Sequence, residues 1–356
     1  MTPELDCNDL APTPFPADVP SIVLPSVSLA KLLSRDKDEA FKVTEVMGST
    51  CIQLYKDILA VARFAGQTFK KVPVPEKQAY KRRDGSAVLD KGYTTALGTF
   101  EDDGTPVAHE TLNIPAFELF DDSAAATLPS WLVEQQALFK RIFERAFEIT
   151  HLILEAFQTA LQVSGRDMLD SHNLTASSGH TIRLLHYTAN TYGKVKGLPT
   201  LSAHRDWTSL TLVFNWLGGL QIPKDNARWL SPDTIHDEDW DWVRPVHGTA
   251  IVNAGEALQY LTGGKIKSGL HRVVPPPAPQ DQVDRYAVFV GLRPRNDWPM
   301  LPYKSDLIEP STEHIEFSGM TCEEWGAFRI GKWLEAAQAR ARKDLMAAGG
   351  AVPAKV

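Results

Sequence analysis

The 356-residue sequence predicts a mainly β catalytic fold with flanking α-helices, because its hydrophobic period changes partway along the chain. Before about residue 165 the pattern is mostly helical, with apolar residues three or four positions apart. After about residue 180 the period is two, as in Leu210, Leu212 and Phe214, which is typical of strands. Glycine pairs at 218–219 and 263–264 separate short apolar runs, and this punctuation indicates an antiparallel sandwich or barrel.

Four segments are expected along the chain. Residues 1–20 are rich in proline and lack any period, so we expect a flexible arm that leads into a short strand at 21–24. Residues 21–175 are expected to be mostly helical and to pack on the barrel. The clearest helix in this region ends before Gly165, and its buried face is formed by Leu138, Ile142, Ala146, Ile149, Ile153 and Phe157. Residues 176–300 are expected to form the catalytic core. Residues 301–356 return to helix, where Thr321 and Glu324 have capping-box spacing.

Composition excludes several classes of partner. The formal net charge is −7 and the basic residues are scattered, so no basic face is expected to bind nucleic acid. No apolar stretch approaches the roughly 20 residues of a membrane-spanning helix, and the N-terminus lacks the pattern of a signal peptide. We therefore expect a cytoplasmic protein without a membrane partner. Nothing in the sequence indicates the oligomeric state.

A pair of metal ligands is suggested by His204 and Asp206, just before the strand expected at 208–215. Alternate side chains of an extended chain share a face, so both groups can reach one metal ion, about 6.6 to 6.8 Å apart along the backbone. The best candidate for a third ligand is His271, in a strand-like segment 67 positions later. Two histidines and one carboxylate leave open positions on the metal, an arrangement associated with non-haem iron(II) oxygenases.

Arg285 is the predicted anion-binding residue. It begins a strand on which Tyr286 and Val288 occupy one face, so its side chain shares the opposite face with Ala287 and Phe289. An arginine directed into a barrel is costly unless it meets an anion, and its planar fork suits a carboxylate. The alternative is a surface arginine at the start of a strand.

These residues lie within longer motifs: IRLLHY, SAHRDWTSLTLVF, GGLQI, IVNAGEALQYLTGGKIKSGLHRVV and DRYAVF. The motifs, dense over about residues 180–295, resemble the iron(II)- and 2-oxoglutarate-dependent dioxygenases of the isopenicillin N synthase-like superfamily. The resemblance implies a double-stranded β-helix, a jelly-roll barrel with a helical N-terminal region and a C-terminal helix. It also implies that His204, Asp206 and His271 bind iron(II), that Arg285 binds the distal carboxylate of 2-oxoglutarate, and that Tyr187 helps to hold this cosubstrate.

The reaction implied by the resemblance consumes 2-oxoglutarate and O2 and yields succinate and CO2. This oxidative decarboxylation would be coupled to hydroxylation, desaturation or cyclisation of a small organic substrate. The sequence does not reveal which of these outcomes occurs. By analogy within the family, we expect the substrate to be a specialised metabolite.

One position departs from the family pattern. The family usually has a serine two residues after the arginine, whereas this chain has Ala287. A hydrogen bond to a charged group contributes about 1.5–3 kcal/mol, so its loss should lower the affinity for 2-oxoglutarate. The departure keeps open an iron(II) oxidase in which Arg285 binds the carboxylate of the substrate itself. A catalytically silent ligand-binding protein of the same fold is a further alternative.

Two other polar features favour structural roles. His186 alternates with Leu184 on a predicted strand, and we expect it to be a hydrogen-bonded core histidine rather than a fourth metal ligand. The acidic stretch at 233–241 resembles a second metal site in composition, and a solvated acidic loop is the preferred interpretation.

Overall fold

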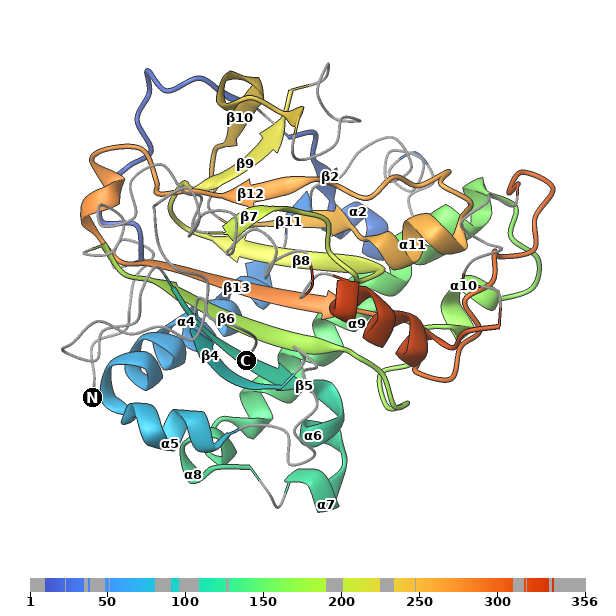
Figure 1. Ribbon diagram of the computed structural model, residues 1–356, viewed down its shortest axis with the longest axis horizontal. Coiled ribbons are helices and arrows are strands. Elements are labelled where there is room, and N and C mark those ends of the chain that lie inside the picture. Colours follow the sequence, from blue (N-terminus) through green and yellow to red (C-terminus); the bar gives the residue numbers. More distant parts are fainter. Residues whose placement is uncertain are drawn as a thin grey trace.

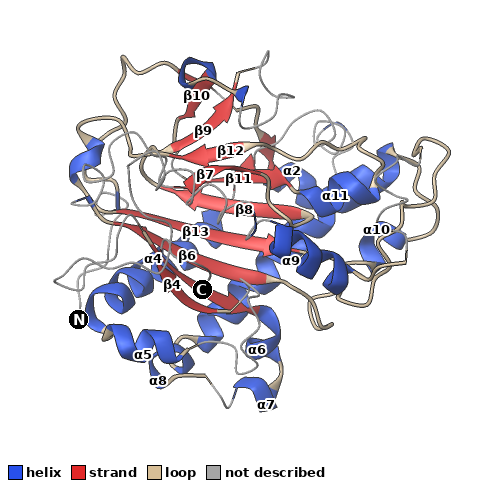
Figure 2. Ribbon diagram, in the orientation of Figure 1, coloured by secondary structure: helices blue, strands red, loops and turns tan. Residues whose placement is uncertain are grey.

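The computed structural model contains two β-sheets with flanking helices. Figures 1 and 2 show the strands at the centre of the molecule, with the helices around them. The structure describes residues 10–22, 24–34, 38, 49–50, 52–80, 91–95, 109–125, 128–189, 201–224, 234–246, 248–309, 317, 319–332 and 335. No helix within these residues is long and apolar enough to cross a membrane.

Among the described residues, the larger sheet has eight strands and is antiparallel apart from the β2–β3 pair. In spatial order its strands are β2 (Val27–Ser28), β3 (Ser49–Thr50), β11 (Thr249–Ala254), β8 (Leu210–Asn215), β13 (Arg285–Leu292), β6 (Thr181–Tyr187), β5 (Glu110–Pro115) and β4 (Gly92–Thr95).

The smaller sheet has five strands in the part of the chain that the structure describes, and it is antiparallel apart from the β1–β10 pair. In spatial order its strands are β1 (Ser21–Ile22), β10 (Trp240–Val243), β9 (Leu220–Pro223), β12 (His271–Val273) and β7 (Leu201–His204). Of the short strand expected at 21–24, Ser21 and Ile22 form β1, and residue 23 lies outside the described residues.

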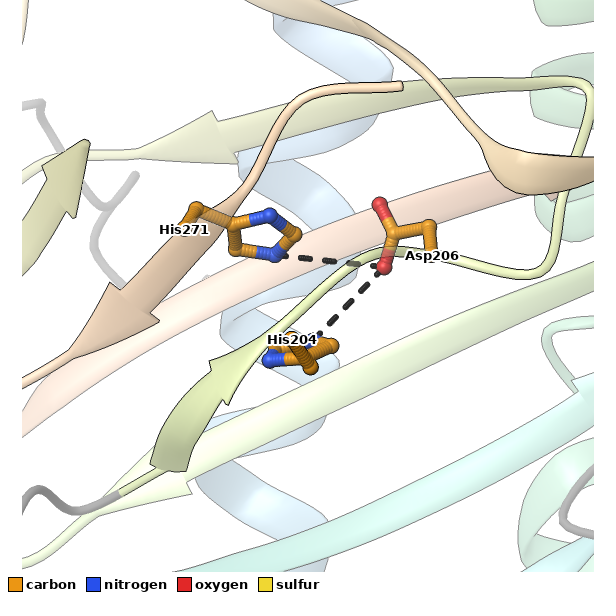
Figure 3. A group of neighbouring side chains, drawn as sticks. All are labelled: His204, Asp206 and His271. Atoms are coloured by element: carbon orange, nitrogen blue, oxygen red, sulfur yellow. Dashed lines mark ion pairs between the residues drawn. The ribbon is translucent and has the colours of Figure 1, made fainter. Parts of the chain in front are cut away.

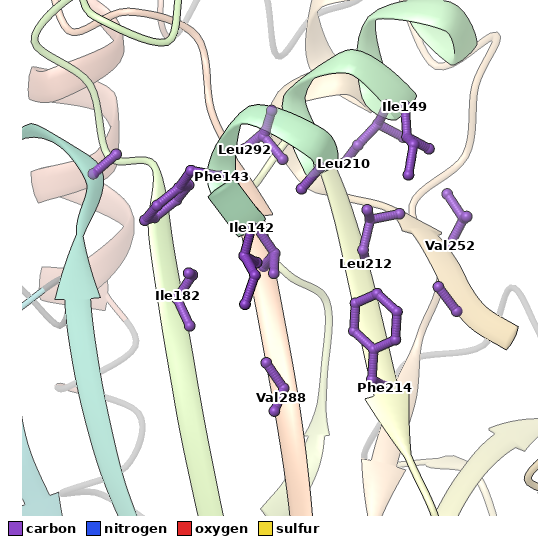
Figure 4. Close-up of a cluster of buried hydrophobic side chains, with 14 of the residues drawn as sticks. Ile142, Phe143, Ile149, Ile182, Leu210, Leu212, Phe214, Val252, Val288 and Leu292 are labelled. Atoms are coloured by element: carbon purple, nitrogen blue, oxygen red, sulfur yellow. The ribbon is translucent and has the colours of Figure 1, made fainter. Parts of the chain in front are cut away.

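Two long helices cover one face of the larger sheet. Helices α4 (Ile52–Lys71) and α9 (Gln136–Ala160) pack on each other and on β13, and α4 also contacts β6. The apolar stripe predicted between residues 138 and 157 is buried at every position, so this prediction is confirmed. Figure 4 shows Ile142, Phe143 and Ile149 of α9 against sheet residues such as Leu212. Burying these side chains away from water is the main force that holds the helices on the sheet.

The remaining helices are short. They are α2 (Leu29–Leu33), α5 (Val74–Ala79), α6 (Ala116–Phe120), α7 (Asp122–Ala125), α8 (Ser130–Val133), α10 (Asp167–Asp170) and α11 (Glu256–Leu261). Residues 322–332 are helical, and the predicted capping box is confirmed: the backbone N–H of Thr321 donates to Glu324 Oε2 at 2.8 Å, and the Glu324 N–H donates to Thr321 Oγ1 at 3.3 Å.

The N-terminal half contains more β structure than its sequence predicts. Strands β4 and β5 extend the larger sheet within a region expected to be mostly helical. In β5, Glu110 and Asn113 are buried, and each has a partner from another strand: Glu110 contacts Tyr93 and His186, and Asn113 contacts Arg183. A strand is recognised in a sequence by the alternation of apolar and polar residues, and buried polar residues interrupt this pattern. Their hydrogen-bond partners are distant in the sequence, so the sequence does not show that these residues are buried.

The two sheets meet through an apolar cluster. Its buried members are Leu185 and Tyr187 of β6, Val273 of β12 and Ala287 of β13, with Leu201 of β7 packed against them. The opposite face of β13, with Val288, Val290 and Leu292, lies in the core under the helices. The face of β13 that carries Ala287 therefore points into the space between the two sheets, where the predicted site lies.

The expected division of the chain into four segments stays a prediction.

Candidate metal centre and cosubstrate site

The three predicted metal ligands come together at the edge of the smaller sheet. His204 ends β7 and is paired in register with His271, which begins β12, so the ring centroids lie 4.3 Å apart. Asp206 follows β7 by two residues, and its Oδ1 lies 3.8 Å from His204 Nε2 and 3.9 Å from His271 Nε2. Figure 3 shows the carboxylate pointing toward both rings. The ligand atoms all lie within 4.8 Å of one another, so one ion can contact all three.

Backbone carbonyls fix which nitrogen of each histidine faces the metal. The Nδ1 of His204 lies 2.8 Å from the carbonyl oxygen of Ser202, and the Nδ1 of His271 lies 3.2 Å from that of Gly269. A carbonyl only accepts hydrogen bonds, so Nδ1 carries the proton in both rings. Each Nε2 then has a free lone pair directed at the centre of the group, as a metal ligand requires.

Asp206 presents one carboxylate oxygen to the two histidines and uses the other for hydrogen bonds. Its Oδ2 accepts from Asn253 Nδ2 at 2.8 Å and from Thr211 Oγ1 at 3.2 Å. Burial by itself raises the pKa of Asp206, but His271, His204 and the Asn253 hydrogen bond outweigh it and lower the pKa. Burial lowers the pKa of His204, with a further contribution from His271. A carboxylate anion beside a neutral imidazole is the protonation state that binds a metal ion.

Arg285 lies in the interior with one donor unused. It begins β13 and is 2% exposed. Its Nε donates to the carbonyl oxygen of Gly218 at 2.7 Å, and its guanidinium carbon lies 4.8 Å from the ring centroid of Tyr187. The Nη1 atom is buried and has no hydrogen-bond partner. A buried cationic donor is costly unless it meets an acceptor, and a guanidinium fork suits a carboxylate.

The two remaining predicted site residues flank this arginine. Tyr187 is the in-register partner of Arg285 on β6 and is 1% exposed. Ala287 lies two residues along β13 on the same face and packs against Tyr187, Leu185 and Val273. The position where the family usually carries a serine therefore adds only apolar surface beside Arg285.

Comparison with known proteins identifies the family. Residues 180–294 match the family model of the 2OG-Fe(II) oxygenase superfamily. The chain is 36% identical over 363 residues to a 2-oxoglutarate-dependent dioxygenase of Aspergillus fumigatus, covering 96% of this chain and 94% of the relative. The chain belongs to the 2-oxoglutarate- and iron(II)-dependent oxygenases. A second relative in this family, the 2-oxoglutarate-dependent dioxygenase frbH of a Dothideomycetidae species, is 28% identical over 78% of this chain and 84% of its own length.

Solved oxygenase structures share the fold of this dioxygenase. A full-length protein of Neurospora crassa, in complex with alpha-KG and 5-formyluracil, superposes with a TM-score of 0.68 at 18% identity, over 88% of this chain and 97% of the Neurospora protein. JOX2, in complex with 2OG, Fe and JA, gives a TM-score of 0.62 at 19% identity, over 88% of this chain and 87% of JOX2.

Family membership makes the protein an enzyme, an oxidoreductase, and the silent ligand-binding alternative is not retained. Its cofactor and cosubstrates are those of the family: iron(II), 2-oxoglutarate and O2. The residues present fit this set. Two imidazoles and one carboxylate form the donor set associated with non-haem iron(II) oxygenases, and the unpaired Nη1 of Arg285 fits a carboxylate.

Three residues close to the centre were not found from the sequence. Asn253 and Thr211 bind Asp206, and Arg183 lies near enough to influence the pKa of both Asp206 and His204. The IRLLHY motif contains Arg183, and its position two residues before Leu185 places it on the interior face. That alternation was a signal for Arg183, whereas nothing in the sequence pairs Asn253 with Asp206.

The interpretation of His186 as a hydrogen-bonded core histidine is confirmed, and that of the acidic stretch is confirmed only for its exposed part before β10, which begins at Trp240. His186 is buried, with Nδ1 2.8 Å from Glu110 Oε1 and Nε2 3.1 Å from Asp284 Oδ2. The acidic loop is described from residue 234, where Asp237 is 89% exposed and accepts a hydrogen bond from Arg272 at 2.7 Å. Within the described part of the chain, His204, Asp206 and His271 are the one cluster with metal-binding geometry.

Proposed function

We propose that this oxygenase couples oxidative decarboxylation of 2-oxoglutarate to oxidation of a small organic substrate, a specialised metabolite. In this proposal His204, Asp206 and His271 bind iron(II), and Arg285, stacked on Tyr187, binds the distal carboxylate of 2-oxoglutarate. We further infer that the two sheets close into the jelly-roll barrel of the family, with these residues in its interior. The fungal relatives named as 2-oxoglutarate-dependent dioxygenases support the assignment.

The bound iron supplies the oxidising chemistry, and the protein supplies placement. The hydrogen bonds from Asn253 and Thr211 hold one oxygen of Asp206, so the other stays directed at the two histidines. The apolar residues around Ala287 exclude water from the place where the carboxylate of 2-oxoglutarate meets Arg285. Low local polarity strengthens this ion pair.

The observation that carries the proposal is the buried, unpaired Nη1 of Arg285. Its Nε is already bonded to Gly218, and its ring partner Tyr187 contributes no negative charge. A guanidinium held in this state is stabilised by an anion, and the family's cosubstrate supplies a carboxylate.

The interior face beside the metal centre also carries features that favour a particular substrate chemistry. The Arg183 guanidinium lies 5.2 Å from the ring centroid of Phe289, and its Nε donates to Asn113 Oδ1 at 2.6 Å. A cation and an aromatic ring side by side suit a flat molecule with a carboxylate or carbonyl group. The two solved oxygenase structures described above likewise contain small molecules, 5-formyluracil and JA.

Succinate formation distinguishes the proposal from an oxidase that spares 2-oxoglutarate. We would incubate the iron(II)-loaded protein with O2, 2-oxoglutarate and a panel of aromatic and carboxylic substrates, and measure succinate and oxidised product. The proposal predicts one succinate for each product. At a 2-oxoglutarate concentration that just saturates the wild type, both should fall sharply in Arg285→Ala and not in the partly exposed control Arg295→Ala. Product formation at an undiminished rate without 2-oxoglutarate would establish the oxidase, in which Arg285 binds the substrate.

A further inference from the structure

The backbone at residues 218–219 packs directly on Arg285. The carbonyl oxygen of Gly218 accepts the hydrogen bond from Arg285 Nε at 2.7 Å. Gly219 has a φ of +111°, and a Cβ at this position would lie 2.9 Å from the carbonyl oxygen of Val274 and 3.1 Å from Arg285 Nε. Only glycine fits this backbone conformation and this contact, so the loop between β8 and β9 is shaped around the arginine.

Gln280 binds the backbone N–H of Gly218, the residue whose carbonyl oxygen accepts the hydrogen bond from Arg285. Its side chain is 1% exposed, and its Oε1 accepts the backbone N–H of Gly218 at 2.9 Å. Its Nε2 donates to the carbonyl oxygen of Thr13 at 2.8 Å. Gln280 thus connects two parts of the chain. One is the loop at residues 218–219, which binds Arg285, and the other is a segment near Thr13, more than 200 positions earlier.

That segment, residues 13–16, is called here the N-terminal strap. The ring of Phe15 lies against Gly218, where an added Cβ would be 2.9 Å from Phe15 Cε2. Arg244 contacts the strap, with its guanidinium carbon 4.8 Å from the Phe15 ring centroid and its Nη2 donating to the carbonyl oxygen of Pro16 at 3.4 Å. Leu10, just before the strap, is buried in the main core.

We propose that Gln280 and the N-terminal strap are positioning elements for Arg285. They fix the Gly218 carbonyl, which occupies Arg285 Nε and holds the guanidinium in one orientation with Nη1 open to a carboxylate. An arginine side chain has a large rotamer entropy, and fixing it beforehand removes that cost from binding. The affinity for 2-oxoglutarate therefore depends on residues that never touch it. This inference rests on the proposed role of Arg285.

The test compares 2-oxoglutarate and metal affinities in matched variants. Gln280→Ala removes both hydrogen bonds, and Phe15→Ala loosens the strap without touching the hydrogen bonds. Gln136→Ala is the control, because it removes a comparable 2.9 Å hydrogen bond to a backbone carbonyl, that of Leu119, in the helical layer. We expect the dissociation constant for 2-oxoglutarate, measured anaerobically on the iron(II) protein, to rise about three- to tenfold in the first two variants. The dissociation constant for iron should stay unchanged.

A second readout needs neither iron nor turnover. In the metal-free protein, solvent exchange of the Arg285 Nε–H should be faster in Gln280→Ala and Phe15→Ala than in the wild type or Gln136→Ala. Unchanged exchange in both variants would overturn the positioning role. If Arg285→Ala weakens 2-oxoglutarate binding while Gln280→Ala and Phe15→Ala do not, the strap proposal also fails and the proposed function stands. If Arg285→Ala leaves 2-oxoglutarate binding unchanged, the proposed function fails, and the exchange measurement still decides the strap.

Discussion

Removing the amide that supports Asp206 should weaken iron binding without removing any ligand. Asn253 Nδ2 donates to Asp206 Oδ2 at 2.8 Å. The Oδ1 of Asn253 packs on Gly269, where an added Cβ would lie 2.2 Å from this oxygen. The carbonyl of Gly269 in turn accepts from His271 Nδ1. Asn253→Ala therefore frees the carboxylate and loosens the support of one histidine.

The size of the effect follows from the hydrogen bond. A hydrogen bond to a charged group contributes about 1.5–3 kcal/mol, which corresponds to roughly 10- to 150-fold in an equilibrium constant. Loss of partners that orient metal ligands typically weakens metal binding by about 10- to 100-fold. We expect Asn253→Ala to raise the iron dissociation constant by at least about tenfold, and Thr211→Val, which removes a longer 3.2 Å bond, to raise it by less.

The assay is anaerobic titration of the metal-free protein with iron(II), followed by equilibrium dialysis and metal analysis. Asn296→Ala is the control, because it removes a 3.1 Å hydrogen bond from a partly exposed asparagine to Ser177. Melting temperatures would show that each variant is folded. Iron binding by folded Asn253→Ala within twofold of the wild type would refute the account of how Asp206 is held.

Three further predictions concern 2-oxoglutarate and pH. Arg285→Ala should raise the 2-oxoglutarate dissociation constant at least about 30-fold, since truncating one member of a buried charge pair costs about 2–5 kcal/mol; equilibrium binding measures this, and a change under threefold would contradict it. Ala287→Ser should lower that constant by about tenfold or more if its hydroxyl reaches the same carboxylate, and an unchanged constant would show a rebuilt pocket. Burial alone lowers the pKa of His186, but Asp284 and Glu110 outweigh it and raise the pKa. The stabilisation of the fold by charged His186 is therefore complete when the pH is below the ordinary histidine pKa, and it is lost as the pH rises through the raised pKa. The free energy of unfolding, measured with urea from pH 6 to 9, should fall, and His186→Gln should make this fall smaller. An equal slope in both proteins would be the contrary result.

The metal centre could be predicted because its ligands carry a local pattern. His204 ends β7 and Asp206 follows two positions later, and this spacing made the two residues candidates for ligands of one metal ion. His271 was the best candidate for a third ligand because it lies in a strand-like segment, and the structure pairs β12 with β7 although the two histidines are 67 positions apart. Arg285 was found because a charged residue on an otherwise apolar strand face needs an explanation.

The strand after the centre begins later than its sequence suggests. It was expected at residue 208 and begins at Leu210. Thr208 instead lies in the bend that follows Asp206, where its Oγ1 is 2.8 Å from Thr211 Oγ1. The carbonyl oxygen of Thr208 packs on Gly255, where an added Cβ would lie 2.0 Å from this oxygen. Contacts of this kind depend on residues nearly 50 positions away and override local strand propensity.

The supporting residues could not be predicted for the same reason. Asn253 reaches Asp206 across 47 positions, and Gln280 reaches Gly218 across 62 and Thr13 across 267. A single amide side chain in a sequence has no period or spacing that indicates such a partner. Only the folded chain shows which buried amides hold the site.

The measurement that tests the central claim most directly is an anaerobic spectral titration of the iron(II) protein with 2-oxoglutarate. A keto acid that chelates the iron produces a weak visible charge-transfer band. The account predicts that the band appears in the wild type, needs a higher 2-oxoglutarate concentration in Arg285→Ala, and is absent in Asp206→Ala because iron is no longer held. Iron bound tightly by the wild type with no band at saturating 2-oxoglutarate would contradict the assignment of this cosubstrate.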